Sequence, residues 1–253
     1  MDIHKEKISN DRKKLCIVIP IYSGKLSHDD IICINLVIKN KGENDLIILA
    51  PYGLIIENMP IEEYKYEYFE KQYFRNADSY SRLLMNERFY KRFQNRYEYI
   101  FIIQLDALLL KPINDEFYNY FRYDYIGAPW EPPVIGYRCY FKGMSLIKKI
   151  LKPRPLSVGN GGASLRNISA CIDLIKKNLL AAAIWNTGED VFFSYYGQIS
   201  NTFKIAPKEI AYSFAMEQHV EEYMEKGIIP FAVHAYKKYY PEIVTQYKEF
   251  FQS

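Results

Sequence analysis

Short apolar runs and amphipathic stretches alternate in the first part of the chain. Leu15 to Ile19 (LCIVI) and Leu46 to Leu49 (LIIL) are uninterrupted apolar runs, which is the pattern of buried strands. Between them, Ser27 is suited to cap a helix, because apolar residues recur at helical spacing in the IICINLVIKN that follows Asp30. The order strand, helix, strand predicts a parallel sheet with a right-handed crossover.

A longer apolar stretch, Tyr99 to Pro112 (YIFIIQLDALLLKP), predicts the central strand of this sheet. Asp106 lies in the middle of it, and burying an unpaired carboxylate costs several kcal/mol. We therefore expect Asp106 where the strand ends and a crevice opens, which is where open α/β sheets bind ligands. The structural alternative is an aspartate that caps a turn after a buried strand.

The rest of the chain continues the α/β pattern. We expect strands in Glu62 to Tyr73, with an exposed turn, and over Ala206 to Phe214. We expect a helix capped by Asp78, a short helix over Asp115 to Arg122 and a helix over Asn167 to Lys177. Glu131 to Leu156 shows no clear hydrophobic period. We predict an α/β fold with a mostly parallel central sheet flanked by helices. Because no internal repeat or low-complexity linker interrupts the chain, residues 1–253 are expected to form one domain, with residues 1–14 as a flexible polar lead-in.

Composition narrows the functional classes. The net charge of +3 is too small to indicate a nucleic-acid-binding protein, although it is compatible with an anionic substrate such as a nucleotide diphosphate. The four cysteines are widely spaced and form no C-x-x-C pair, so they indicate neither a zinc site nor a redox motif. The polar start lacks an apolar signal core, and no apolar run approaches the roughly 20 residues that span a bilayer. We expect a cytoplasmic protein, and loose peripheral attachment to a membrane stays open.

Several polar positions are candidates for chemistry. Asn160, Gly161 and Gly162 indicate either a turn or a close approach of the backbone to a ligand. Glu189 and Asp190 precede an apolar run, so they either cap a helix N-terminus or supply a carboxylate that takes a proton from an acceptor hydroxyl.

A second group of candidates is basic. His234, in an apolar run, is either a core histidine or a ligand that joins a carboxylate on a divalent ion. Lys237 and Lys238 follow it and are suited to neutralise phosphates. Arg82 has the same potential role, or it is a solvent-facing helix residue.

These segments together resemble a known family. IVIPIY, SYSRLLMNERFYKRF, YEYIFIIQLDALLL, DYIGAPW, VGNGGASLR, GEDVFFS and FAVHAYKKYY occur in that order from about Leu15 to Tyr240. The set is similar to a bacterial family of GT-A-type glycosyltransferases, most of whose members are described only as a domain of unknown function. The resemblance implies a GT-A-like fold, with a Rossmann-like nucleotide-binding half and an acceptor-binding half.

The resemblance also implies roles for individual residues. Asp106 matches the second aspartate of the Asp-x-Asp that ends a central strand in GT-A enzymes, and Gln104 stands where the first would be. A late histidine and a nearby lysine often complete such sites, which points to His234 with Lys237 or Lys238. The Glu-Asp pair resembles the segment that supplies the base of inverting members, which favours Asp190 over Glu189.

The remaining implied roles concern the ligands. Pro20, Tyr22 and Pro51 would line the base pocket of a nucleotide sugar, most simply a UDP-sugar, and Trp130 would stack on a glycan or glycolipid acceptor. The backbone of residues 160–162 would approach the donor sugar. Mn²⁺ or Mg²⁺ is expected on Asp106 and His234. Because an amide contributes less charge than a carboxylate, a metal-free site that relies on Arg82 and the two lysines is the alternative.

Two other functions compete with this interpretation. A sugar-phosphate nucleotidyltransferase would open with a long glycine-rich, basic loop after the first strand, whereas this chain has IYSGKLS. A non-catalytic carbohydrate- or nucleotide-binding protein would explain Gln104, but it gives no reason for Glu189, Asp190 and His234 to occur together.

Overall fold

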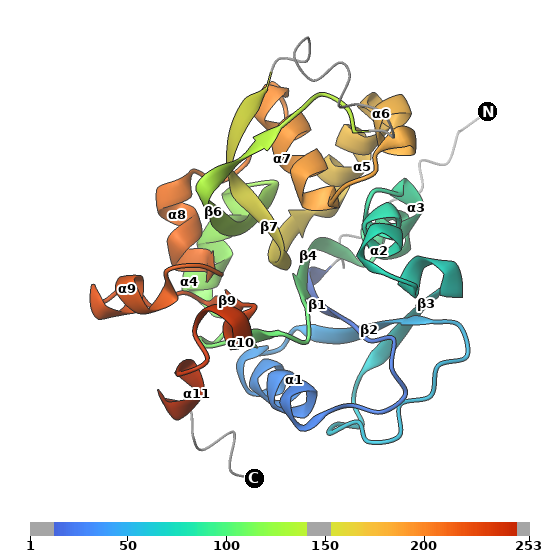
Figure 1. Cartoon of the computed structure of the whole chain (residues 1–253). Coiled ribbons are helices and arrows are strands. Elements are labelled where there is room, and N and C mark those ends of the chain that lie inside the picture. The colour runs from blue at the N-terminus through green and yellow to red at the C-terminus, as the bar shows by residue number, and fades with distance from the viewer. Residues whose placement is uncertain (1–12, 141–152, 247–253) are drawn as a thin grey trace, which may run out of the picture.

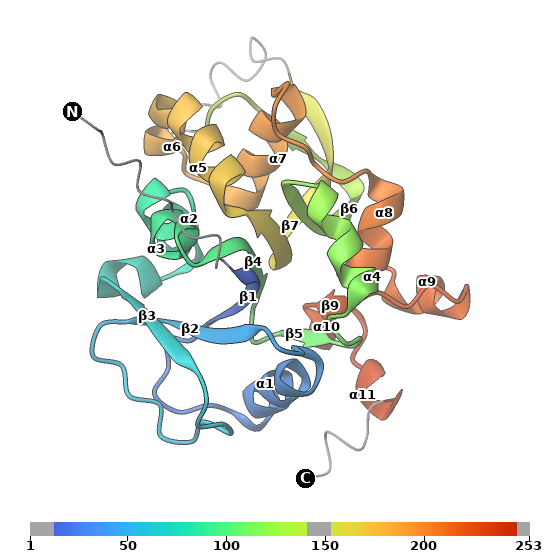
Figure 2. The same cartoon turned by 180° about the vertical axis from the view of Figure 1, so that it is seen from behind.

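The computed structural model describes residues 13–140 and 153–246, and its centre is a six-stranded sheet with the order β3-β2-β1-β4-β7-β6 (Figures 1 and 2). Its strands are β1 (Lys13–Pro20), β2 (Asp45–Pro51), β3 (Lys65–Phe69), β4 (Tyr97–Ile103), β6 (Tyr125–Gly136) and β7 (Arg154–Asn167). The pairs of β1 with β2, β1 with β4 and β2 with β3 are parallel, whereas β7 is antiparallel to both of its neighbours. The predicted mostly parallel sheet is confirmed.

A second, three-stranded sheet has the order β5-β9-β8. It consists of β5 (Ala107–Leu109), β8 (Ala215–Met216) and β9 (Ala232–His234). The apolar stretch that was predicted as one strand is therefore two: β4 ends at Ile103, the chain turns, and β5 enters the other sheet.

Helices cover both faces of the main sheet (Figures 1 and 2). They are α1 (His28–Asn40), α2 (Ala77–Leu84), α3 (Glu87–Gln94), α4 (Asp115–Tyr118), α5 (Ile168–Lys177), α6 (Leu179–Ile184), α7 (Glu189–Ile199), α8 (Lys208–Phe214), α9 (Val220–Glu225), α10 (Tyr236–Tyr239) and α11 (Ile243–Gln246), with 3₁₀ turns at Lys71–Phe74 and Asn119–Arg122. The predicted cap of α1 is confirmed, because the Ser27 side chain accepts from the Asp30 N–H and Asp30 accepts in return from the Ser27 N–H.

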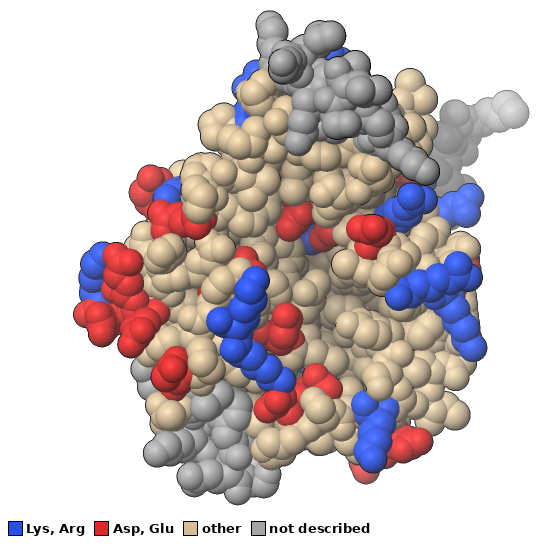
Figure 3. Space-filling view, viewed as in Figure 1, with Lys and Arg blue, Asp and Glu red and all other residues tan. Residues whose placement is uncertain are grey.

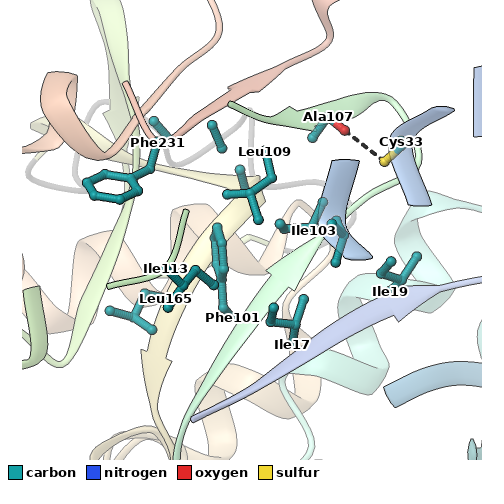
Figure 4. Close-up of a cluster of buried hydrophobic side chains, with 14 of the residues drawn as sticks. Ile17, Ile19, Cys33, Phe101, Ile103, Ala107, Leu109, Ile113, Leu165 and Phe231 are labelled. Atoms are coloured by element: carbon teal, nitrogen blue, oxygen red, sulfur yellow. Dashed lines mark hydrogen bonds between the residues drawn. The ribbon is translucent and has the colours of Figure 1, made fainter. Parts of the chain in front are cut away.

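Each face of the sheet has its own core. Along β1, Leu15, Ile17 and Ile19 pack on the side of α1, whereas Cys16 and Val18 pack on the opposite side, as the twofold alternation of a strand requires. Figure 4 shows the first cluster, where Phe101, Leu109 and Phe231 meet beneath the end of β4. The Cys33 thiol donates to the Ala107 carbonyl at 2.8 Å in the same region, which ties α1 to the start of β5.

Three local predictions need correction. The helix predicted to start at Asp78 begins after Asn76, whose side chain accepts from the Ser79 N–H. It breaks into α2 and α3 because Asn86 accepts from the Arg88 N–H and starts a new helix.

The segment Ala206 to Phe214 is mainly helix α8 and not a strand. Pro207 precedes the first turn, where a missing N–H costs nothing, and Ala211 and Phe214 bury one face.

The stretch Glu131 to Leu156, which showed no clear period, begins with the second half of β6 (Tyr125–Gly136). Its prolines are tolerated because β6 is the edge strand of the sheet, where a missing N–H leaves no neighbour unpaired. Of the lead-in predicted for residues 1–14, Lys13 and Lys14 belong to β1, and residues 1–12 lie outside the described residues.

Candidate functional site

Asp106 lies in the turn that joins the two sheets. The Gln104 N–H donates to the Gly162 carbonyl at 2.8 Å, and the Ala107 N–H donates to the Gln104 carbonyl at 3.0 Å, so the chain reverses directly after β4. The Asp106 side chain is 50% exposed. The prediction that this carboxylate sits where the strand ends is confirmed.

The small sheet brings a histidine and a second carboxylate to Asp106. Ala107 pairs with His234, so Asp106 lies beside the imidazole. Met216 pairs with Val233 in the parallel direction, so Glu217 follows on the other side of the same ring. The Asp106 Oδ1 is 3.3 Å from the His234 Nε2, and the Glu217 Oε1 is 3.7 Å from the Nδ1. The sheet therefore builds a carboxylate–imidazole–carboxylate row, which we call the His234 cluster.

In the His234 cluster, Asp106 and His234 stabilise each other's charged forms. Burial alone would raise the pKa of Asp106 and lower that of His234, but their mutual attraction reverses both shifts, so the pKa of Asp106 falls and that of His234 rises. Burial raises the pKa of Glu217 against the opposing effect of His234. The Asn160 amide donates to the Glu217 Oε2 at 2.6 Å and holds that carboxylate in place.

His234 is buried, and its ring nitrogens lie 3.3 Å from Asp106 and 3.7 Å from Glu217, but neither nitrogen makes a well-aligned hydrogen bond within the described part of the chain. Gly162 lies directly against the ring, and a Cβ at that position would overlap it. A buried polar atom without a partner costs free energy, so it commonly marks a position where a ligand, ion or water binds. The glycine in VGNGG was predicted to mark either a turn or a close approach; it lies inside strand β7, and the close approach is to His234.

A second charged cluster lies next to Gly161 and is fully paired. Arg166 is completely buried and donates to the Glu189 Oε1 at 2.8 Å, while the Ser81 hydroxyl donates to the Glu189 Oε2 at the same distance. Arg166 also donates to the Tyr90 hydroxyl at 3.1 Å. We call this the Arg166 cluster. It holds α2, α7 and β7 together and leaves Glu189 without a free oxygen.

Asp190 differs from its neighbour Glu189. It lies in the first turn of α7, where its Oδ1 accepts from the Val191 N–H at 2.7 Å. Burial, followed by repulsion from Glu189, raises its pKa to about 7. A carboxyl group with this pKa can exchange a proton near neutral pH, whereas the ion-paired Glu189 is held in a structural role.

A crevice of about 590 Å³ opens beside Asp106 at the ends of β1 and β4. Figure 3 shows acidic and basic side chains gathered around the central hollow of this face. The crevice is lined by Pro20, Tyr22, Ser23, Asp30, Phe74, Arg75, Asn76, Ala77, Tyr80, Gln104, Leu105, Asp106 and Lys237. The Tyr80 hydroxyl is buried and has no hydrogen-bond partner among the described residues, so the crevice wall also offers a donor.

The predicted site residues divide between the crevice and other places. Pro20, Tyr22, Gln104 and Lys237 line it, and the Lys237 ammonium is 2.5 Å from an Asp29 carboxylate oxygen. Four others lie outside the crevice lining. Pro51 is buried outside the crevice, Lys238 is exposed and bonds to the Tyr239 hydroxyl, Arg82 lines an adjoining cavity, and Trp130 is buried in the core against Gly159 and offers no open stacking face.

Two functional candidates, Glu217 and Arg75, and one buried structural residue, Arg166, were missed. Glu217 carries no local signal, because only the register of β8 and β9 places it beside His234. Arg75 lines the crevice from the turn before α2. Arg166 could have been found, since a cation in the apolar run GGASLR requires a buried partner.

Two searches of the described residues bear on cofactors and membranes. They contain no group of three or more histidine, cysteine or carboxylate side chains arranged to hold a metal ion. Among the same residues, none of the helices has the length and apolar character that a bilayer crossing requires.

Comparison with known proteins identifies the family. The model of a protein family of unknown function, DUF5672, matches residues 63–234, which is more than half of the chain. The chain belongs to this family. No curated protein matches the sequence. The match contains β4, β7 and β9, so the DUF5672 region includes Asp106, Asp190 and His234.

Solved structures show the fold of this family member. The bifunctional glycosyltransferase WbbM is 11% identical with a TM-score of 0.51, over 88% of this chain and 45% of WbbM. Mouse xyloside xylosyltransferase 1 is 11% identical with a TM-score of 0.49, over 87% of this chain and 97% of that protein. The galactosyltransferase LgtC is 10% identical with a TM-score of 0.49, over 86% of each chain. The central sheet flanked by helices is a GT-A-like fold, as predicted.

Proposed function

We propose that this protein is a glycosyltransferase that moves a sugar from a nucleotide-diphosphate sugar, a UDP-sugar in the simplest case, to a hydroxyl of a glycan or glycolipid acceptor with inversion. The observation that carries the proposal is the His234 cluster beside the crevice. A buried histidine, whose ring nitrogens have ion-pair contacts but no well-aligned hydrogen bond among the described residues, faces a carboxylate at the end of the central strand. That is the edge of an α/β sheet where ligands bind.

The crevice supports a phosphorylated, polar donor. Its volume of about 590 Å³ lies in the range of small-molecule sites. Arg75 and Lys237 supply positive charge to a diphosphate, and the Tyr80 hydroxyl is available to a ligand. Tyr22 is 66% exposed at the wall, where it can cover a base or a sugar ring.

Asp106 and His234 fit a divalent cation. A carboxylate oxygen and an imidazole nitrogen are donors that Mn²⁺ accepts, and the imidazole nitrogens make no well-aligned hydrogen bond among the described residues. These two side chains would hold Mn²⁺ or Mg²⁺, with the donor phosphates completing the shell, since Gln104 removes one carboxylate. A bound cation would supply positive charge that stabilises the leaving diphosphate.

Asp190 is proposed as the base because its pKa is about 7, near neutral pH. Glu189 is not, because its two carboxylate oxygens already accept hydrogen bonds from Arg166 and Ser81. In the reaction, Asp190 takes the proton of the acceptor hydroxyl and the acceptor oxygen forms a bond to the anomeric carbon. The bond from that carbon to the diphosphate breaks, and the nucleoside diphosphate leaves with the electron pair. Attack opposite to the leaving group inverts the anomeric centre.

Nucleotide binding tests the donor half of the proposal. UDP, GDP and CDP are added with and without Mn²⁺, and the melting temperature is measured. UDP should stabilise most, by about 3 kcal/mol at 100 times its dissociation constant. Asp106→Asn should lose the Mn²⁺-dependent part, whereas Asp115→Asn, an exposed aspartate in α4, should keep it. No stabilisation by any nucleotide would refute the proposal.

A substitution at Asp190 tests the catalytic half. Asp190→Asn should retain UDP binding and lower sugar transfer by about 10² to 10⁴-fold. Asp173→Asn, an exposed aspartate on α5, is the matched control and should transfer normally. Full activity of Asp190→Asn would show that another group is the base.

Gln104 favours one other function, a carbohydrate- or nucleotide-binding protein that retains the fold without the chemistry. Incubation with a panel of UDP-sugars separates the two. Release of UDP that depends on Asp190 identifies a transferase, and binding without release identifies the non-catalytic protein.

A further inference from the structure

A second cavity, of about 800 Å³, adjoins the crevice on the outer side of α2. Its polar wall comes from α2 and the turn before it, with Arg75, Asp78 and Arg82. Its apolar wall comes from α5 and α6, with Ile175 and Leu179. In both cartoon views α2 lies near α5 and α6 (Figures 1 and 2). We call this cavity the α2–α6 groove.

The groove and the crevice adjoin at the start of α2. Arg75 and Asn76 line both cavities, so a molecule in the groove meets the proposed donor site at the N-terminus of α2. Groove and crevice together therefore can hold two substrates at adjacent ends.

The groove has positive charge that the described residues do not neutralise. Neither Arg75 nor Arg82 forms a side-chain ion pair within residues 13–140 and 153–246. The Glu87 carboxylate in the wall is taken by Lys91 at 3.0 Å and Lys176 at 3.8 Å. Asp78 is the other carboxylate at the groove, so the two guanidinium groups exceed the negative charge available to them.

Helix α6 is apolar and exposed. Its sequence is LLAAAI, and none of its residues is buried. Leu179, Leu180 and Ile184 have exposed fractions of 60%, 85% and 52%. Of these residues Leu179 lines the groove, together with Ala182 and Ala183, whereas Leu180 and Ile184 are not part of its lining.

We propose that the acceptor is a lipid-linked phosphate that binds in the α2–α6 groove. Arg82 binds the phosphate, the hydrocarbon chain lies against the α6 residues that line the groove, and the hydroxyl-bearing end points toward the donor crevice. Two observations select this amphiphile over a purely polar glycan: unneutralised guanidinium groups and an apolar wall occur in one groove, and that groove opens onto the crevice. The inference rests on the proposed transferase function, whose acceptor it specifies.

The experiment measures binding of octyl phosphate, kept below its micelle concentration, by isothermal titration. Inorganic phosphate lacks the chain and octyl glucoside lacks the charge, so both should bind at least about tenfold more weakly. Arg82→Gln and Leu179→Ser should each weaken octyl phosphate binding, Arg82→Gln by about tenfold, because both residues line the groove and each variant removes one half of the recognition. Arg122→Gln and Ile229→Ser are matched exposed controls outside the groove and should bind as the wild type.

The outcomes separate this inference from the proposed function. Equal binding of octyl phosphate and octyl glucoside, or an Arg82→Gln variant that binds like Arg122→Gln, would overturn the inference. Stabilisation by UDP is measured on the same samples. If UDP binds and octyl phosphate does not, the acceptor assignment fails while the donor site stands. If octyl phosphate binds as expected and no nucleotide does, the groove is supported and the donor site fails.

Discussion

The Arg166 cluster and the His234 cluster differ in how completely their polar atoms are paired. They flank consecutive residues of β7, Gly161 and Gly162. In the Arg166 cluster the guanidinium meets Glu189, Tyr90 and Ser164, and Glu189 also accepts from Ser81. In the His234 cluster both imidazole nitrogens are buried without a hydrogen bond from the described residues.

Because the two clusters differ in hydrogen-bond pairing, we assign them different roles, although their charged residues look alike in the sequence. Saturated buried ion pairs fix neighbouring elements relative to one another and leave nothing for a ligand. Unsatisfied buried nitrogens cost stability, so their retention is best explained by an occupant that satisfies them. The Arg166–Glu189 pair beside Gly161 is therefore structural, whereas our proposed function assigns metal binding to His234 beside Gly162 and proton transfer to Asp190.

The largest expected effect is on stability, from Arg166→Met. The substitution leaves Glu189 buried without its cation, and breaking such a pair costs about 3–5 kcal/mol. Urea denaturation measures the loss, with the exposed Arg122→Met as control. A loss below about 1 kcal/mol would contradict a structural role for the cluster.

A pair of glycine substitutions compares the two sides directly. Gly162→Ala places a Cβ into the His234 ring and should cost about 1–3 kcal/mol through overpacking. It should also abolish the Mn²⁺-dependent part of UDP stabilisation, because the ring must leave Asp106. Gly161→Ala places a Cβ 2.8 Å from the Glu189 Oε1, so it should lower stability and keep the Mn²⁺ effect. Loss of the Mn²⁺ effect in both variants would remove the distinction.

The pH dependence of stability tests the raised pKa of Asp190. Its pKa is raised from 3.8 to about 7, so between these values the folded state binds a proton that the unfolded state has released. Its contribution to the free energy of unfolding is therefore present at low pH and is lost as the pH rises from about 4 to about 7. Urea denaturation across this range should show that the wild type loses stability relative to Asp190→Asn. A constant difference between the two proteins would contradict the raised pKa.

The smallest effect is expected from Asp106→Asn. Because the side chain is half exposed, stability should change by no more than about 0.5 kcal/mol. The pKa of His234 should fall, since Asp106 raises it, and NMR titration of the imidazole measures this shift. An unchanged His234 pKa would show that the two side chains are not coupled.

Sequence reasoning found the parts of the fold that local patterns determine. Neighbouring residues determine the buried runs of β1 and β2 and the capping box at Ser27, and the structure confirms these features. It missed β6, whose prolines hide an edge strand, and it mistook α8 for a strand because Ile210, Tyr212 and Phe214 alternate as apolar residues do in a strand.

The candidate site likewise divides into residues that local sequence patterns identify and residues that only the folded structure identifies. Asp106 was placed correctly because a carboxylate at the end of an apolar strand is a local signal. The role of Glu217 depends on which strands pair, and the partners of Arg166 come from the distant helices α3 and α7. Trp130 looked available for stacking only because the core around it is assembled from distant segments. Burial and register are properties of the folded chain, so they could not be derived from the spacing of these residues.

The pairing of β5 with β9 has a consequence for the order of events during synthesis. A ribosome completes Asp106, and all of β1 to β4, long before it adds His234. The sheet around Asp106 can thus fold on the emerging chain while the partner strand that delivers the imidazole is still untranslated. The His234 cluster is therefore completed late, when β9 pairs with β5. A nascent chain stalled before that strand would present the crevice without its histidine.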